Sequence, residues 1–493
     1  MAEEENAVDK KMRRNSVVLA LACLCAAFVL VGLCSQSSPL YPTNTWVDAN
    51  CLLTVGRAMK NGSVLYRDIY EQKGPTLYLI HDLAAFISDS SFFGVFVLEV
   101  LSLAAVLCAG FKVIRRRMSG AAAFGAAVLV GAMIVTGGAF AQGDSAEEFC
   151  LPFLAGALCM ACSAYGQRSA PMGAKKLFAC GMMAGVVATI KYPALGLFIG
   201  LCAVEGVLAL CEGGLPRALR SAGVFLAGML LPIVLWIAYF AAHGALEAFY
   251  TAYIHNNIFL YSDEARTAMD VMRDMVNAVR ENLLWVLAAC GGMAVLVLDK
   301  KETAALKACV WAMAACSFAA VFLLGRTFRY YPLVLSVFAF VGVSSLGGLL
   351  PSVTRKTVHV VSACSCVFAL GCALLLSPNA PVRGVKREEL AQTRLAAYVQ
   401  PGATLLQYSH LDDGLYLFTG TLPTQRYFCR LNVSDPVMQE ELNRYLEEAV
   451  VDYVLVSWEE LPPEFDRYQW IATDAGYDDL NQINKYLHLY RKK

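Results

Sequence analysis

Two residues of opposite charge lie near the ends of a loop that follows the first apolar run of the chain. Asp48 lies in the first turn of a predicted short helix, 45–61, and Lys73 directly precedes Gly74 and Pro75, where a second helix can start. A carboxylate can take a proton from a hydroxyl group, and a lysine beside a helix N-terminus suits an anion such as phosphate. Each residue also has a structural explanation. Asp48 lies at capping-box spacing from Thr45, and Lys73 can extend to lipid headgroups.

A second pair of carboxylates, Glu147 and Glu148, begins another predicted helix. Ser145 can cap this helix, because Glu148 follows it by three residues. The alternative is a functional role, because two adjacent carboxylates beside an apolar run are costly without a partner. Both explanations remain open.

Other polar groups carry weaker indications. Lys191 lies at the joint between two apolar runs, where phosphate contact and extension to headgroups explain it equally well. Asn256 and Asn257, with nearby tyrosines, suit the hydroxyl groups and ring faces of a sugar, but aromatic residues are also common at membrane interfaces. The 410–413 stretch contains His and Asp residues, which we interpret as a turn before Gly414.

The composition shows what must position these residues. The 493-residue chain is 58% hydrophobic and 16% charged, with 40 basic and 40 acidic residues. The zero net charge argues against a nucleic-acid partner. Apolar runs of about 20 residues match the thickness of a bilayer, so the chain is predicted to be a polytopic membrane protein. Nearly all of its 18 cysteines lie within apolar runs, and Cys51 and Cys429 are the two clearly outside.

Eleven membrane spans are predicted, and basic residues in every second loop set their orientation. Lys10, Lys11, Arg13 and Arg14 precede the first span, which places 1–15 in the cytoplasm. Segments 36–90, 243–280 and 378–493 are then outside. The spans lie near 16–35, 91–112, 119–138, 148–165, 176–190, 193–211, 221–242, 281–298, 306–324, 330–350 and 357–377.

The tail 378–493 differs from the rest in composition, with 17 acidic and 12 basic residues. Short β-rich runs at 404–408, 452–458 and 485–490 alternate with helix-like stretches at 386–399 and 436–449. This alternation predicts a small extracytoplasmic α/β domain.

Several short motifs together resemble the GT-C membrane glycosyltransferases, in the branch of the protein O-mannosyltransferases and the lipid A aminoarabinose transferase. One departure is Lys73-Gly74-Pro75, where better-known members have two prolines, and it leaves the substrate open. The motifs are Asp48-Ala49, Gly56-Arg57-Ala58-Met59, Tyr66-Arg67-Asp68, Lys73-Gly74-Pro75 with Leu77-Tyr78, Glu147-Glu148 with Leu151-Pro152-Phe153, Lys191-Tyr192-Pro193, Asn256-Asn257 with Tyr261, and Arg329-Tyr330-Tyr331.

The resemblance implies an all-α GT-C-like membrane domain over 16–377, followed by the α/β domain. It implies inverting transfer of a sugar from a polyprenyl-phosphate donor to a cell-envelope acceptor (a glycan, lipid or protein) on the outer face of the cytoplasmic membrane. Asp48 is the expected base, with Glu148 as its rival, and cations are expected to stabilise the phosphate leaving group. The other expected substrate-binding residues are Arg57, Asp68, Lys73, Glu147, Lys191, Asn256, Asn257, Tyr261, Arg326, Arg329 and Tyr330.

No cofactor is expected. A divalent metal is less favoured, because the first loop has no closely spaced Asp-x-Asp and because Lys and Arg can meet the phosphate charge. A transporter or flippase for lipid-linked or small solutes is the alternative function. Transporters tend to show paired halves and charges at the bilayer midplane, whereas these charges lie at span ends on one side. A third alternative is an assembly or receptor protein that acts through its acidic tail.

Overall fold

The computed structural model describes residues 2–260, 267–323, 325, 327–350, 354–433, 435–478 and 483–493. The chain divides into two compact units. Unit 1 comprises Met1–Ser35, Glu99–Ile233 and Arg266–Pro381, and unit 2 comprises Gln36–Leu98, Val234–Ala265 and Val382–Lys493. Unit 2 thus combines much of the two predicted outer loops with the C-terminal tail.

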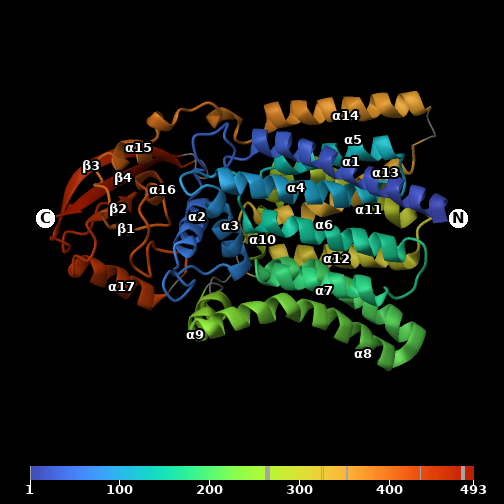
Figure 1. The fold of residues 1–493 in the computed structure, drawn as a ribbon, viewed down its shortest axis with the longest axis horizontal. Helices are drawn as coiled ribbons and strands as arrows, with labels where there is room; N and C mark the ends of the chain where they lie inside the picture. Colours follow the sequence, from blue (N-terminus) through green and yellow to red (C-terminus); the bar gives the residue numbers. More distant parts are fainter. Residues whose placement is uncertain are drawn as a thin grey trace. The chain divides into compact units, whose positions relative to one another are not determined.

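Unit 1 is built from apolar helices, among which α5 packs on α14, α11 on α13, and α6 on α7 (Figure 1). The helices with most of their residues in unit 1 are α1 (Ala2–Cys34), α4 (Phe93–Ile114), α5 (Gly120–Val135), α6 (Ala146–Tyr165), α7 (Ala174–Ala188), α8 (Gly196–Ala242), α10 (Ala268–Glu281), α11 (Leu283–Leu298), α12 (Ala304–Phe322), α13 (Phe338–Gly347) and α14 (Arg355–Leu376), with the 3-10 turns η1 (Tyr192–Leu195) and η3 (Tyr331–Val337).

Small residues allow helices of this unit to approach closely. A Cβ atom added to Gly292 of α11 would lie 2.0 Å from the carbonyl oxygen of Gly342 on α13. In a membrane, where burial of apolar surface does not drive association, such close backbone approach lets van der Waals contacts hold helices together.

The number of candidate spans, counted by helix length and apolar composition, is lower than the eleven predicted. Within the described residues, six helices are long and apolar enough to cross a membrane, and a seventh results if α10 and α11, bent by 99°, are one span. The chain is therefore a multi-pass membrane protein. Every predicted span coincides with helical structure, but α5, α7 and the η3–α13 segment are short. The predicted spans 193–211 and 221–242 form one long helix, α8, interrupted at Gly213 and Gly214.

In unit 2, α2 (Val47–Lys60) packs closely on α3 (Pro75–Ile87). A Cβ atom on Gly56 would lie 2.4 Å from the carbonyl carbon of His81, so only glycine permits this crossing. The helix α2 falls within the predicted 45–61, and Pro75 starts α3 as expected. Further along the chain, α9 (Leu246–Phe249) and the π-helix η2 (Tyr250–Leu260) also belong to this unit.

The rest of unit 2 is the predicted α/β domain, with the strand order β1-β2-β4-β3. The parallel pair β1 (Leu405–Gln407) and β2 (Tyr453–Ser457) is joined across α17 (Pro436–Glu447), as parallel strands require. The strands β4 (Ile483–Lys492) and β3 (Tyr468–Asp478) continue the sheet in antiparallel fashion. The predicted runs correspond to β1, β2 and β4, while β3 was not predicted. The short helices are α15 (Ala391–Ala396) and α16 (Leu415–Thr419).

Candidate active site

The start of α2 positions Asp48 without the predicted cap. The N-cap residue is Trp46 and makes no side-chain cap, and the Thr45 hydroxyl donates to Gln36 Oε1 at 2.8 Å instead. The predicted Thr45 cap is therefore wrong, because α2 begins at Val47 and its N-cap position falls on Trp46. Asp48 still lies in the first helical turn, where backbone N–H groups favour a negative side chain.

The Lys73 ammonium lies between two carboxyl groups. Its Nζ donates to Asp48 Oδ1 at 2.8 Å and to Glu71 Oε1 at 2.9 Å. The exposed fraction of the side chain is 22% for Lys73, 14% for Asp48 and 1% for Glu71. The structure thus brings together two sequence-predicted residues and adds Glu71, which sequence reasoning did not select. A carboxylate two residues before the lysine was the available signal.

The backbone around Lys73 is also fixed. Its N–H donates to Glu71 Oε2 at 3.0 Å, and its carbonyl oxygen accepts from the Tyr66 hydroxyl at 2.6 Å. Tyr66 is fully buried and has a φ of 66°, a left-handed conformation that non-glycine residues rarely adopt. Gly74 and Pro75 then start α3. Backbone strain of this kind is concentrated at functional sites.

The electrostatics keep Lys73 charged. Burial lowers the pKa of the Lys73 ammonium, but the nearby carboxyl groups of Asp48 and Glu71 raise it more, so the pKa lies well above its ordinary value. Lys73 is therefore a cation at neutral pH and can attract an anion, but it cannot serve as a base.

Asn256 and Asn257 connect η2 to the first-loop segment beside Lys73. Asn256 Nδ2 donates to the Tyr70 hydroxyl at 2.6 Å, and Asn257 Nδ2 donates to the carbonyl oxygen of Gln72 at 2.7 Å. These predicted sugar-binding amides thus hold the segment that carries Glu71 and Lys73. The third predicted residue here, Tyr261, lies outside the described residues.

Arg57 and Asp68 make local contacts within unit 2. The buried Arg57 guanidinium donates to the carbonyl oxygens of Tyr416 at 3.0 Å and Gly420 at 3.1 Å, which ties α2 to α16. Asp68 accepts from the Arg67 guanidinium at 2.8 Å and from the Val64 N–H at 2.8 Å. Both arrangements have structural roles, and the predicted substrate contacts of the two residues stay predictions.

Unit 1 holds a second ion pair among predicted residues. Lys191 Nζ, just before η1, donates to Glu147 Oε1 at the start of α6. The ammonium also lies 3.5 Å from the ring centre of Tyr331 and 5.2 Å from that of Tyr330, an arrangement of cation–π contacts. Glu147 is buried, and its Oε2 has no hydrogen-bond partner among the described residues. Lys191, Glu147 and Tyr330 are thus brought together.

Ser145 caps α6 as the structural explanation of Glu148 predicted, because the Glu148 N–H donates to Ser145 Oγ at 3.1 Å. The Glu148 side chain is also buried and accepts from the Asp144 N–H at 2.9 Å. Glu99 of α4 accepts from the same N–H and from the Ser35 hydroxyl, both at 2.9 Å. Sequence reasoning missed Glu99, whose signal was a lone carboxylate inside an apolar run.

Arg329 and Arg326 complete the predicted cations. Arg329 Nε donates to Glu281 Oε2 at 2.8 Å, and both side chains are about a third exposed. Arg326 lies outside the described residues.

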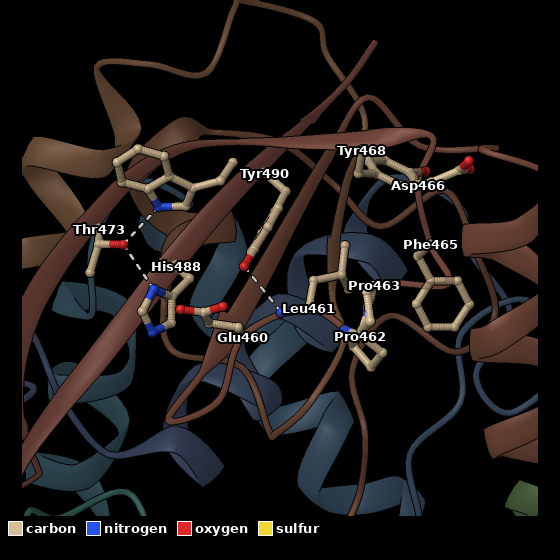
Figure 2. A pocket seen from close by; sticks show the side chains of 11 residues that line it. Glu460, Leu461, Pro462, Pro463, Phe465, Asp466, Tyr468, Thr473, His488 and Tyr490 are labelled. Carbon is tan, nitrogen blue, oxygen red and sulfur yellow. Dashed lines mark hydrogen bonds between the residues drawn. The ribbon is translucent and has the colours of Figure 1, made fainter.

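A pocket of about 460 Å³ lies on the C-terminal sheet, against β3 and β4 and the segment 460–466 (Figure 2). Figure 2 shows Thr473 beside His488, and the Thr473 hydroxyl bonds both His488 Nδ1 and the Trp470 indole at 2.8 Å. The described lining residues include the carboxylates of Glu460 and Asp466 but no Lys or Arg, so the pocket does not suit a phosphate. No sequence prediction pointed to it.

A metal site is not apparent within the described segments, where no three His, Cys, Asp or Glu side chains are grouped to hold an ion. Metal independence stays a prediction.

Comparison with known proteins identifies a family and a fold. A family model described as "Putative competence-induced protein Ccs4 N-terminal domain" matches residues 9–350. A search of curated proteins gives no match. The structure of ArnT from Cupriavidus metallidurans bound to undecaprenyl phosphate is similar at a TM-score of 0.63, with 13% identity over 96% of this chain and 97% of that chain.

Two further solved structures are similar. The apo state of the same ArnT aligns at a TM-score of 0.61 and 12% identity, again over 96% and 97% of the two chains. The Archaeoglobus fulgidus oligosaccharyltransferase in complex with Zn and sulfate aligns at a TM-score of 0.47 and 14% identity, over 94% of this chain and 72% of that one. The expected GT-C-like fold class is confirmed by the likeness to ArnT. Because the family model covers more than half of its length, the chain belongs to the Ccs4 N-terminal domain family.

Proposed function

We propose that the chain is a glycosyltransferase that moves a sugar from a polyprenyl-phosphate donor to a cell-envelope acceptor on the outer face of the cytoplasmic membrane. In this orientation the N-terminus is cytoplasmic and the domain 378–493 is outside. The observation that carries the proposal is the partly buried cluster of Asp48, Lys73 and Glu71 at the starts of α2 and α3. A second support is the fold, because the similar ArnT structure is bound to undecaprenyl phosphate.

The cluster supplies the two functions that this reaction needs. Asp48 removes the proton of the acceptor hydroxyl as it attacks the anomeric carbon, and inversion follows from a single displacement. Lys73 stabilises the charge that develops on the lipid-phosphate leaving group. The Glu71 carboxylate accepts hydrogen bonds from both the ammonium and the backbone N–H of Lys73. These two contacts fix the cation beside Asp48 before substrate binds.

The remaining predicted residues have supporting roles. Asn256 and Asn257 position the segment before α3 and can offer amide groups to the sugar. Glu148 remains the rival base. Its Oε1 is buried and has no hydrogen-bond partner within the described part of the chain. Glu147, Lys191, Arg329 and Tyr330 keep the substrate-binding roles that the resemblance implies.

The test is a transfer assay with the purified full-length protein, a panel of polyprenyl-phosphate sugars and a cell-envelope extract as acceptor. Loss of a general base lowers the rate about 10²–10⁴-fold, which is the decrease expected for Asp48→Asn. The control is Asp89→Asn, a carboxylate on the surface after α3 that pairs with Lys60 and should leave transfer unchanged. Undiminished transfer by Asp48→Asn would move the base to Glu148, and no transfer from any donor would reject the function.

A further inference from the structure

The cysteines of the chain are unevenly divided between the two units. Of the 18 cysteines, 16 lie in the three segments of unit 1, and most are within apolar helices. Cys51 and Cys429 are the two cysteines of unit 2. They are 378 positions apart, yet their Sγ atoms lie 3.7 Å from each other, and their exposed fractions are 0% and 1%.

Both cysteines are held by ordered neighbours. Cys51 lies on the buried part of α2, and its Sγ accepts from the Asp412 N–H at 3.3 Å. Cys429 follows Phe428, whose carbonyl oxygen accepts from the Gln407 N–H of β1 at 3.1 Å. The sulfur contact therefore joins a helix of the first loop to the segment that is hydrogen-bonded to β1, the edge strand of the C-terminal sheet.

We propose that Cys51 and Cys429 form a disulfide bond that ties α2 to the C-terminal domain in the mature protein. This inference rests on the proposed function in one respect, because that function places unit 2 outside the cytoplasm, where disulfides persist. A disulfide is about 2 Å long, so closing the bond requires the sulfur atoms to approach by less than 2 Å.

The bond forms by thiol–disulfide exchange. One cysteine thiolate attacks the disulfide of an oxidised thiol–disulfide oxidoreductase, and the second cysteine then displaces that enzyme from the mixed disulfide. Two S–H bonds of this chain and the S–S bond of the oxidoreductase break, and an S–S bond forms between Cys51 and Cys429. The oxidoreductase takes up the two electrons and the two protons and becomes a dithiol.

The order of events follows from burial. Burial raises the pKa of both thiols, most strongly for Cys51, and it also shields both from a protein oxidant. Exchange therefore precedes the packing of the 405–429 segment on α2. Once closed, the bond anchors α2 one turn after Asp48 and so helps to position the carboxyl group.

The experiment labels thiols in membranes that contain the full-length protein. Free thiols are blocked with N-ethylmaleimide in denaturant at lysis, the sample is reduced, and newly released thiols take an isotopically heavy maleimide. We expect the heavy label on Cys51 and Cys429 and the light label on Cys290, the unit 1 control. Light label on both Cys51 and Cys429 would overturn the proposal.

Variants extend the test. In the Cys51→Ser variant, Cys429 has no partner for a disulfide and should carry the light label instead of the heavy one. Reductant should lower the apparent unfolding temperature of the wild type but not that of the Cys51→Ala/Cys429→Ala variant, and an equal decrease in both would contradict the bond. The labelling needs no activity. If Cys51 and Cys429 are free thiols but sugar transfer is intact, only the disulfide proposal is rejected. If the disulfide is present but no sugar is transferred, only the proposed function is rejected.

Discussion

Replacing Lys73 by methionine tests how far the cluster depends on its single cation. Methionine keeps much of the apolar stem of Lys73 but removes the ammonium. The Glu71 carboxylate, whose side chain is only 1% exposed, then loses the hydrogen bond to its Oε1. Removing one partner of a buried ion pair costs about 3–5 kcal/mol, because the other charge stays buried without compensation. Since Asp48 keeps 14% exposure to solvent, we expect Lys73→Met to lower the free energy of unfolding by about 3 kcal/mol, the lower end of that range.

A surface ion pair of nearly the same length is the matched control. Lys60 Nζ lies 2.7 Å from Asp89 Oδ2, but the exposed fractions of these side chains are 24% and 53%. Exposed pairs contribute at most about 1 kcal/mol, so Lys60→Met should cost no more than that. The two lysines are about equally exposed, so the difference in unfolding free energy between the two methionine variants reports the effect of burying the carboxylate partner.

A rescue variant separates charge from packing. Adding Glu71→Gln to Lys73→Met removes the unpaired carboxylate, while the amide oxygen can still accept the backbone N–H at position 73. Part of the lost stability should therefore return. The assay is denaturant unfolding of the purified protein in detergent, followed by tryptophan fluorescence. Equal losses in Lys73→Met and Lys60→Met, or no recovery in the double variant, would refute the reasoning.

Three further predictions concern the surroundings of this cluster. Burial raises the pKa of Asp412 from 3.8 to about 6, so the folded protein keeps a proton that the unfolded chain has released, and stability should fall by about 2 kcal/mol from pH 4 to pH 6. In Asp412→Asn this fall, measured by unfolding at each pH, should disappear. Gly56→Ala should lower the unfolding temperature and sugar transfer because its Cβ would overlap His81, whereas Gly206→Ala, with open space around it, should not. Treatment with a chelator should leave transfer unchanged, and a loss that Mg²⁺ or Mn²⁺ restores would contradict this.

Local patterns of the chain were enough to predict most of its elements. Membrane helices and buried strands depend on runs of apolar residues, so the predicted spans coincide with helices and β2 matches a fully buried run. Fewer candidate spans are counted in the described residues than the eleven predicted, because α5, α7 and α13 are short and because the predicted spans 193–211 and 221–242 form one helix, α8. The strand β3 was missed because its second half, 473–478, is rich in Asp and Gly and lacks a strand pattern.

The candidate site was only partly predictable for a different reason. Asp48 and Lys73 were found because charges at helix starts are visible over a few residues. Asp412 was interpreted as part of a turn, and it does accept from the Gly414 N–H at 2.8 Å. Its second acceptor role, from the Thr54 hydroxyl at 2.7 Å, joins residues 358 positions apart. A single sequence carries no signal for such a contact.

The helix α2 shows how these contacts produce one arrangement. At every third position, α2 carries a side chain with a different partner: Asp48 with Lys73, Cys51 with Cys429, Thr54 with Asp412, and Arg57 with the Tyr416 carbonyl oxygen. Each step of three residues turns the side chain by about 60°, so these four form a stripe that winds about halfway around the helix. The sequence predicted an apolar side for α2, whereas all residues from Ala49 to Ala58 are buried.

Burial of this stripe explains why such a helix can hold a charged residue in place. Three of its four side chains bind the C-terminal segment 412–429, and the fourth, Asp48, faces the cation before α3. The C-terminal domain therefore fixes the rotation of α2, and with it the direction of the Asp48 carboxyl group. Changes at Cys51 or Thr54 should then reduce transfer without touching substrate, in proportion to the stability that each one removes from unit 2.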